Sequence, residues 1–427
     1  MALEIDLGPT AQAFRDELRS WLEVNRPEHL VGVESERAAF GDVPGIKEWT
    51  AKLHAAGYLC VSWPKEYGGR GLSGVEVAVM NEEFARAGVP RVTRGMGEWL
   101  VGPSIIVWGT DEQKAYFLPR IIDGTDTYCQ GFSEPDAGSD LAGLKTRGVV
   151  DGDEVVITGQ KVWTSGSQAA NMMFCLCRTD PDAPKHRGIS YVLTPMFRED
   201  GSSNGFDLRP IRQPTGGSHF TETFITEAKA PLFNVIGGLN NGWRVTMTTL
   251  GNERGGNATT QHVQYTKQFW DAVDLTRKYG RENDPVIRQQ LAWAFSHVEI
   301  MRFQGLKVLS EVIAKKEPGP ASSINKMFWS EYAQRFAEIV VNIRGMDSTV
   351  IPGDDPSAYA PDKWTTNFLS TRSVTIWGGT AQVQRNIVGE RVLGLPKEPD
   401  AEAQRRGTKE PAKSEPAKSE PAAGADA

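Results

Sequence analysis

The sequence has little of what several large classes of protein require. Four cysteines in 427 residues are too few for a disulfide framework, and the six histidines lack the short paired spacings of metal ligands. No uncharged apolar run reaches the about 18 residues of a membrane span, and no basic segment precedes an apolar stretch at the start. We therefore expect a cytoplasmic protein with reduced thiols, no bound metal, no membrane span and no secretion signal.

The charge balance argues against a nucleic-acid partner. Lys and Arg number 47 and Asp and Glu number 54, which gives a net charge of −7, and the basic residues form no dense patch. A hydrophobic content of 39% is enough for several cores, and the length suggests about three domains of roughly 150 residues each.

The first third of the chain has the pattern of short helices. Two capping boxes mark helix starts, one formed by Ser73 with Glu76 and one by Thr110 with Gln113. We expect Pro119 to end the second of these helices because proline removes a backbone donor inside a helix. This part of the sequence predicts an all-α N-terminal domain over residues 1–127.

The pattern then changes to short β-branched runs and later returns to long helical periods. A hairpin is predicted where Asp151 and Gly152 separate two valine-rich runs, and residues 128–236 read as an all-β domain. Asp284 and Pro285 mark the start of a long helix in a third, helical domain over residues 237–396. The tail over 397–427, with two EPAKS repeats, has no apolar side chain large enough to form a core and is expected to be disordered.

Two polar segments in the middle domain are candidates for ligand contact. Residues 130–140, QGFSEPDAGSD, predict a tight turn with exposed backbone N–H groups and hydroxyls, and residues 159–165, GQKVWTS, place an aromatic ring beside two hydroxyls. Taken alone, each segment is better interpreted as an ordinary polar turn or as a strand end with a core tryptophan.

Four separated segments give the chain a specific resemblance. They occur in the order GTDEQKAYFLPRI, SEPDAGSDLAGLKT, ITGQKVWTS and IWGGTAQVQRNIVGERVLGLP. With these segments the chain resembles the acyl-CoA dehydrogenase family over about residues 10–396. The resemblance implies an α+β multidomain fold with an N-terminal all-α domain, a middle β-barrel or sandwich and a C-terminal four-helix bundle. It also implies that FAD lies between the middle domain and the bundle, generally touching a neighbouring subunit.

Position by position, the resemblance also implies contact residues. For FAD these are Gln130, Phe132, Ser133, Ser139, Trp163, Thr164, Ser165, Thr380 and Gln382. For the acyl-CoA substrate they are Ser139, Arg254 and Gly379. From its residue type alone, Arg254 could equally be a surface cation.

The catalytic base does not stand where many family members carry it. Gly378 occupies that place and cannot accept a proton, whereas Glu253 matches the position used by relatives that resemble isovaleryl, long-chain and steroid side-chain enzymes. A helical spacing of Trp243, Met247 and Leu250 predicts an apolar face with Glu253 at its edge, where desolvation would make the carboxylate more basic. Without the resemblance, an ion pair on a solvated face would be the default for this glutamate.

The predicted function is FAD-dependent α,β-dehydrogenation of an acyl-CoA thioester to trans-2-enoyl-CoA, with Glu253 as base. An electron-transfer flavoprotein is the expected electron acceptor, and a homotetramer or a heterotetramer with a related chain is the expected assembly. The resemblance hints at a branched, long or polycyclic acyl group. Two alternatives stay open, namely a non-catalytic subunit of a heteromeric enzyme and an acyl-CoA oxidase or flavin monooxygenase of similar fold.

Overall fold

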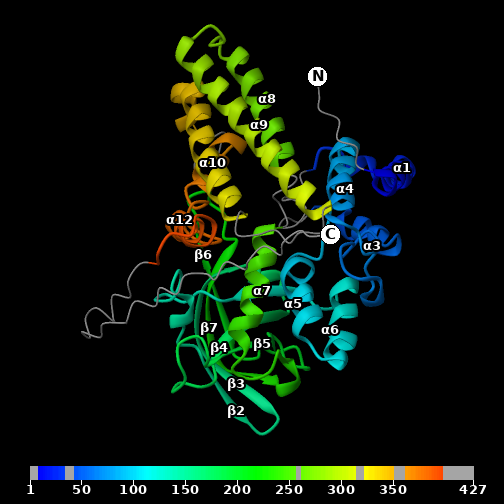
Figure 1. Ribbon diagram of the computed structural model, residues 1–427, viewed down its shortest axis with the longest axis vertical. Helices are drawn as coiled ribbons and strands as arrows, with labels where there is room; N and C mark the ends of the chain where they lie inside the picture. The colour runs from blue at the N-terminus through cyan, green and yellow to red at the C-terminus, as the bar shows by residue number, and fades with distance from the viewer. Residues whose placement is uncertain (1–7, 34–42, 256–260, 314–321, 351–360, 398–427) are drawn as a thin grey trace, which may run out of the picture.

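The computed structural model describes residues 8–33, 43–255, 261–313, 322–350 and 361–397. Within these ranges, a group of short helices, a β-sheet and a set of long helices follow one another along the chain (Figure 1). No helix in the described ranges combines the length and the apolar character needed to cross a membrane. Nearly all of the predicted tail, from residue 398 on, lies outside the described residues.

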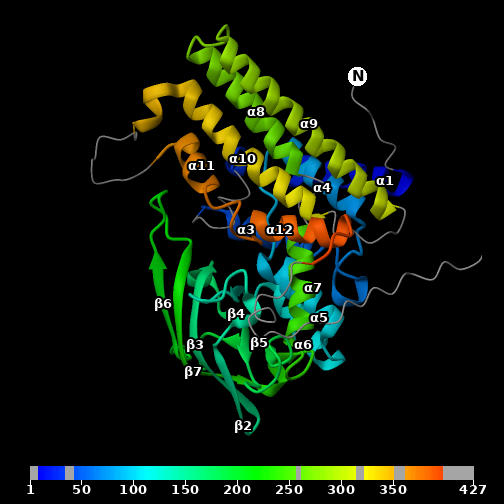
Figure 2. The ribbon, with the colours of Figure 1, turned by 60° about the vertical axis from the view of Figure 1, so that its left-hand side comes forward.

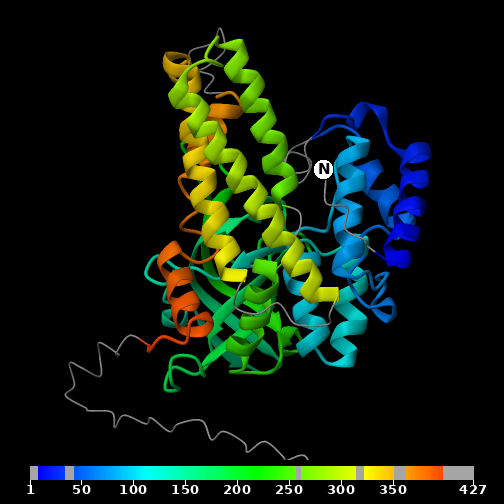
Figure 3. The same cartoon turned by 45° about the horizontal axis from the view of Figure 1, so that its top comes forward.

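Five α-helices form the N-terminal part. They are α1 (Gly8–Asn25), α3 (Ile46–Ala55), α4 (Gly74–Ala87), α5 (Gly102–Trp108) and α6 (Asp111–Asp123) among the described residues. Both predicted capping boxes are confirmed: the Ser73 N–H donates to Glu76 Oε2 at 2.8 Å, and the Thr110 N–H donates to Gln113 Oε1 at 2.9 Å. In Figure 3 the blue N-terminal helices stand beside the long C-terminal helices.

The prediction that Pro119 ends a helix is wrong. Helix α6 continues through Pro119 to Asp123 and ends at Gly124, whose φ is 87°. Phe117, Leu118 and Ile121 on either side of the proline are each at most 1% exposed. Their burial outweighs the cost of an interior proline, about 3 kcal/mol.

A tryptophan ties the N-terminal helices together. Trp63 is 2% exposed, and its indole Nε1 donates to the carbonyl of Glu98 at 3.1 Å. The ring lies so close to Gly102, the first residue of α5, that a Cβ on this glycine would come within 1.9 Å of the ring. Glycine is therefore required at position 102 by the close approach of the indole.

Eight strands of the described residues form one mixed sheet in the order β6-β7-β3-β2-β4-β5-β8, with β1 paired to β4 in parallel. Their bounds are β1 (Tyr128–Gly131), β2 (Arg147–Asp151), β3 (Glu154–Ser165), β4 (Met172–Arg178), β5 (Ile189–Pro195), β6 (Phe206–Ile211), β7 (Phe220–Pro231) and β8 (Val235–Ile236). The predicted hairpin is confirmed because β2 and β3 are antiparallel, with Asp151 opposite Glu154.

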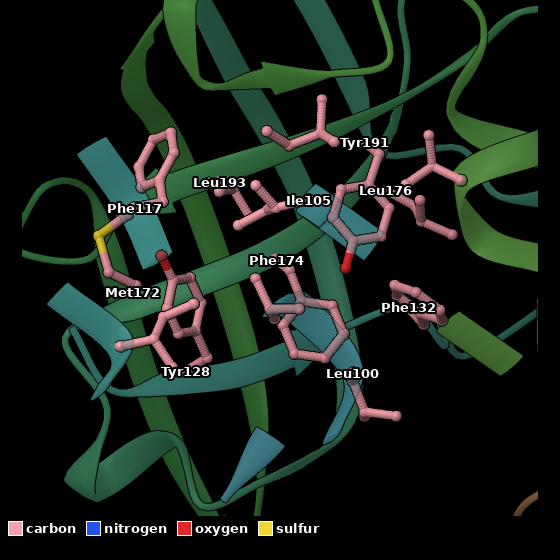
Figure 4. Close-up of a cluster of buried hydrophobic side chains, with 14 of the residues drawn as sticks. Leu100, Ile105, Phe117, Tyr128, Phe132, Met172, Phe174, Leu176, Tyr191 and Leu193 are labelled. Atoms are coloured by element: carbon pink, nitrogen blue, oxygen red, sulfur yellow. The ribbon is translucent and has the colours of Figure 1, made fainter. Parts of the chain in front are cut away.

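Strand β4 is buried on both faces and separates two cores. Alternate side chains point to opposite faces of a strand, so Phe174 and its neighbours two residues away pack toward α5 and α6. Cys175 and Cys177 pack on the other face with Ile157 and Ile225 from β3 and β7. Figure 4 shows the first core, where the rings of Phe174 and Tyr191 stack at 5.9 Å.

The C-terminal part is helical, as predicted. Its described α-helices are α7 (Gly242–Gly255), α8 (Gln261–Lys278), α9 (Pro285–Ile313), α10 (Ser322–Arg344), α11 (Lys363–Thr371) and α12 (Ala381–Ile387). The predicted cap of α9 is confirmed, because Asp284 Oδ1 accepts from the Val286 N–H at 2.9 Å and the Ile287 N–H at 3.3 Å. Helix α12 lies between α10 and the sheet in both views (Figures 1 and 2).

Candidate functional site

The turn after β1 and the end of β3 lie side by side. The N–H of Val162 on β3 donates to the carbonyl of Ser133 at 2.9 Å. Phe132 is 5% exposed, and its ring packs edge-on against Phe174 at 5.4 Å and Tyr191 at 6.1 Å. Two segments that the sequence singled out separately are thus brought together, and the buried ring fixes the first of them.

A β-bulge turns Trp163 outward. Residues 161 and 163 of a regular strand would face the same side, yet Lys161 is fully buried and Trp163 is 60% exposed. The register with β7 shifts between Lys161 and Thr164, and Trp163 has a φ of 61°. A positive φ is strained for a bulky residue, so the fold stabilises an exposed indole at a local cost.

The other predicted contact residues of the middle domain differ in exposure. Gln130 on β1 and Ser133 are half-buried, and Ser139 is exposed. Thr164 is fully buried, and its hydroxyl accepts from Thr223 on β7 at 3.2 Å. Ser165 ends β3 opposite Phe220 and is half-buried.

The turn before α12 carries the predicted contacts of the C-terminal domain. Gly378 and Gly379 both have positive φ, 65° and 88°, and Thr380 caps the helix by accepting from the Val383 N–H at 3.1 Å. Gln382 is exposed. Gln384 is fully buried and donates to the Gly378 carbonyl at 3.1 Å, while its Oε1 has no hydrogen-bond partner within the described part of the chain.

Helix α7 is anchored by contacts of the residues that precede the predicted base, Glu253. The hydroxyls of Thr249 and Ser104 of α5 share a 2.8 Å hydrogen bond, and Trp108 Nε1 donates to Thr248 Oγ1 at 2.8 Å. At its first residue, Gly242, a Cβ would come within 2.4 Å of the Ser190 backbone on β5. The rotation and position of α7 are therefore fixed from two sides.

The predicted apolar face of α7 is only part of its buried surface, since Trp243 and Leu250 are half-buried and pack against the core. Met247 is 42% exposed, whereas Val245, Thr246 and Thr249 are fully buried. Glu253 follows Thr249 by four residues, so its Cα lies on the buried side of the helix. The side chains of Glu253 and Arg254 lie outside the described part of the structure.

The described residues fit a flat ligand with polar edges. The exposed Trp163 ring offers a surface for stacking, and the hydroxyl of Ser139 is accessible on the neighbouring turn. An isoalloxazine ring has both the planar face and the polar rim that this set of groups can contact.

Comparison with known proteins shows which family the chain belongs to. Family models described as the N-terminal, middle and C-terminal domains of acyl-CoA dehydrogenase match residues 8–125, 129–227 and 240–393. The acyl-CoA dehydrogenase IpdE1 of Mycobacterium tuberculosis is 38% identical over 393 residues, which cover 91% of this chain and 98% of that protein. The chain belongs to the acyl-CoA dehydrogenase family. It is an enzyme of this flavoprotein family, and the predicted three-domain fold class is confirmed.

Solved structures of this family resemble the chain over nearly its whole length. A structure titled Tcur3481-Tcur3483 steroid ACAD has a TM-score of 0.77 and 32% identity, and the match covers 92% of this chain and 100% of that one. The ChsE4-ChsE5 complex from Mycobacterium tuberculosis has a TM-score of 0.71 and 30% identity, with 93% and 100% covered.

The sequence analysis missed residues that hold the site together. Lys161 and Glu134, which lie within the two polar segments but were not singled out, form a buried ion pair, and the buried Gln384 donates to the Gly378 carbonyl. The signal for the ion pair was a lysine inside a strand in which apolar and polar residues otherwise alternate. No comparable signal marks Gln384, since a single glutamine in a helix is ordinarily exposed.

Proposed function

We propose that this enzyme binds FAD and removes the α-proton and β-hydrogen of an acyl-CoA thioester to give the trans-2-enoyl-CoA. The observation that carries the proposal is that the turn at Ser133 is hydrogen-bonded to the bulged end of β3, where the Trp163 ring is exposed. When bound, FAD would supply the electron acceptor, at flavin N5, for the β-hydrogen and its electron pair. The proposed domain boundaries remain 1–127, 128–236 and 237–396.

Within this proposal the protein positions the flavin and supplies the base. The backbone of Gln130 and Phe132, with the hydroxyls of Ser133 and Ser139, would hold the flavin from the turn. Trp163, Thr164 and Ser165 would flank it from β3, and Thr380 and Gln382 would contact it from α12. Arg254 and Gly379, with Ser139, would contact the substrate.

Glu253 is the proposed base that takes the α-proton from the thioester. Support comes from α7, which is anchored by Thr249 and Thr248 one turn earlier and therefore holds the backbone of Glu253 in a defined place. A base must keep its distance to the reacting carbon constant to be effective. The anchoring of α7 meets this requirement because it fixes the position of the helix that carries Glu253.

The proposed substrate class is a branched, long or polycyclic acyl-CoA. It is supported by similarity to a structure whose title calls it a steroid ACAD. We further propose an electron-transfer flavoprotein as electron acceptor and a homotetramer or a heterotetramer with a related chain. Similarity to two structures titled as pairs of chains supports the heteromeric form. Ile376 and Leu393, exposed by 63% and 66% near α12, add an apolar surface suited to a neighbouring subunit.

The visible spectrum of the purified protein tests this proposal. Under anaerobic conditions, addition of short, long, branched and steroid-chain acyl-CoA thioesters in turn is expected to bleach the flavin band with one class only. A colourless protein that takes up no FAD would contradict the proposal and favour a non-catalytic subunit. Steady peroxide formation in air without an added acceptor would instead identify an oxidase.

Returning a carboxylate to position 378 is not expected to restore a base. The φ of 65° at Gly378 disfavours any side chain by about 1–2 kcal/mol, so Gly378→Glu should distort the turn before α12. In an enzyme that already carries Glu253→Gln, adding Gly378→Glu should leave flavin reduction at the level of the single variant. The rate of bleaching by acyl-CoA measures this, with Gly378→Ala as the control for backbone strain. A large gain in rate with glutamate alone would show that this position can still host the base.

A further inference from the structure

A charged pair is buried next to both proposed flavin-facing segments. Lys161 is fully buried, and its ammonium donates to Glu134 Oε1 at 2.8 Å and to the carbonyl of Phe132 at 3.1 Å. Lys161 stands two residues before Trp163 on β3, and Glu134 directly follows Ser133. One ammonium group therefore contacts the turn at two points and belongs to the strand that presents the indole.

Glu134 is fixed further by its own turn. Its Oε2 accepts from the Lys145 N–H at 2.6 Å, and its Oε1 accepts from the Thr146 N–H at 2.9 Å. Its backbone also exchanges two 3.0 Å hydrogen bonds with Ala137, which closes the turn. Burial acts to raise the pKa of the Glu134 carboxyl, but the Lys161 charge and these hydrogen bonds together lower it below its ordinary value. The carboxylate is thus ionised at neutral pH.

A buried ion pair adds little to the stability of a protein, but it restricts how the groups around it can be arranged. Removing two charges from water costs about as much as their attraction returns, so a buried ion pair adds little net stability. A charged group that must be satisfied nevertheless permits few arrangements of its partners. Here the partners are the Phe132 carbonyl and the Glu134 side chain, which lie on either side of Ser133, whose carbonyl receives the Val162 N–H.

We propose that Lys161 and Glu134 are positioning residues for FAD, which join the turn after β1 to the bulged end of β3 in one preformed cradle. The inference rests on the proposed function, because it takes the Phe132, Ser133 and Trp163 segments as the flavin contacts. The pair does not touch the reacting atoms. It acts by holding the Phe132 backbone and the Trp163 bulge in register before the cofactor arrives, which lowers the ordering cost of binding.

The decisive variant removes both charges at once. Lys161→Met with Glu134→Gln leaves no unpaired buried charge, whereas either single variant would leave one and could fail to fold. The matched control is Lys229→Met with Glu154→Gln, which removes an exposed 2.9 Å pair between β3 and β7. Both double variants are purified as full chains with FAD, and folding is checked by circular dichroism.

Two flavin properties are then measured. The first is the rate at which free FAD fluorescence appears on dilution of the holoprotein, and the second is the shape of the visible band at saturating FAD. The Lys161 and Glu134 double variant should release FAD about 10-fold faster or more and show an altered band, while the control stays like the natural protein. If the double variant does not fold, Glu134→Asp carries the test, because it keeps both charges and shortens the reach by one methylene.

The outcomes separate the two levels of the proposal. Wild-type release and an unchanged visible band in the double variant, or in Glu134→Asp when that variant carries the test, would overturn the positioning role and leave the proposed function intact. A natural protein that binds no FAD at all would overturn the proposed function first.

Discussion

Glu253→Gln is expected to slow flavin reduction by acyl-CoA by about 100- to 10,000-fold, the usual contribution of a positioned general base. The amide has nearly the shape of the carboxylate but cannot accept the α-proton. Because α7 is anchored through Thr248 and Thr249, which the variant keeps, FAD content should not change. Anaerobic stopped-flow bleaching at saturating thioester measures the rate.

The matched control for this prediction is Glu23→Gln, an exposed glutamate on α1 far from α7 in the sequence. It should reduce its flavin at the rate of the natural protein. Full-rate bleaching in Glu253→Gln would mean that another group takes the proton.

Trp63→Ala is expected to destabilise the protein by about 3–5 kcal/mol, as is typical when a large buried aromatic is truncated. The variant loses the contact of the indole with Gly102 and leaves the Glu98 carbonyl without its donor. The cavity would open in the core that α5 shares with β4 and α7. The urea dependence of unfolding, measured at fixed FAD concentration, checks this value.

A second tryptophan provides the comparison for Trp63. Trp270 on α8 is 52% exposed, and Trp270→Ala should change the free energy of unfolding by less than about 1 kcal/mol. Equal effects of the two substitutions would contradict the role assigned to the Trp63 indole.

Elements that depend on local chemistry could be predicted from the sequence. The capping boxes at Ser73 and Thr110 and the cap at Asp284 need only residues within one helical turn of each other. The hairpin around Asp151 likewise needs only its own turn. Motif order identified the family because four separated segments had to agree, which is a stronger constraint than any one of them.

Features that depend on contacts distant in sequence could not be predicted. Pro119 is tolerated because residues around it meet a core built from other segments. The buried face of α7 includes the Thr249 hydroxyl because this group hydrogen-bonds to Ser104, which lies 145 residues earlier. Lys161 and Glu134 form an ion pair although they lie 27 residues apart in the sequence, and lysine and glutamate are residue types that are ordinarily exposed.

Because β4 is buried on both faces, its two thiols are unreactive in the native protein. Cys175 and Cys177 are fully buried, and burial raises the pKa of the Cys175 thiol to about 11 and that of Cys177 above its usual range. An alkylating reagent should therefore leave both sulfurs unmodified until β4 separates from β3 and β7. The rate at which the reagent labels them would therefore report the rate at which the middle domain opens, and no probe would have to be added to the chain.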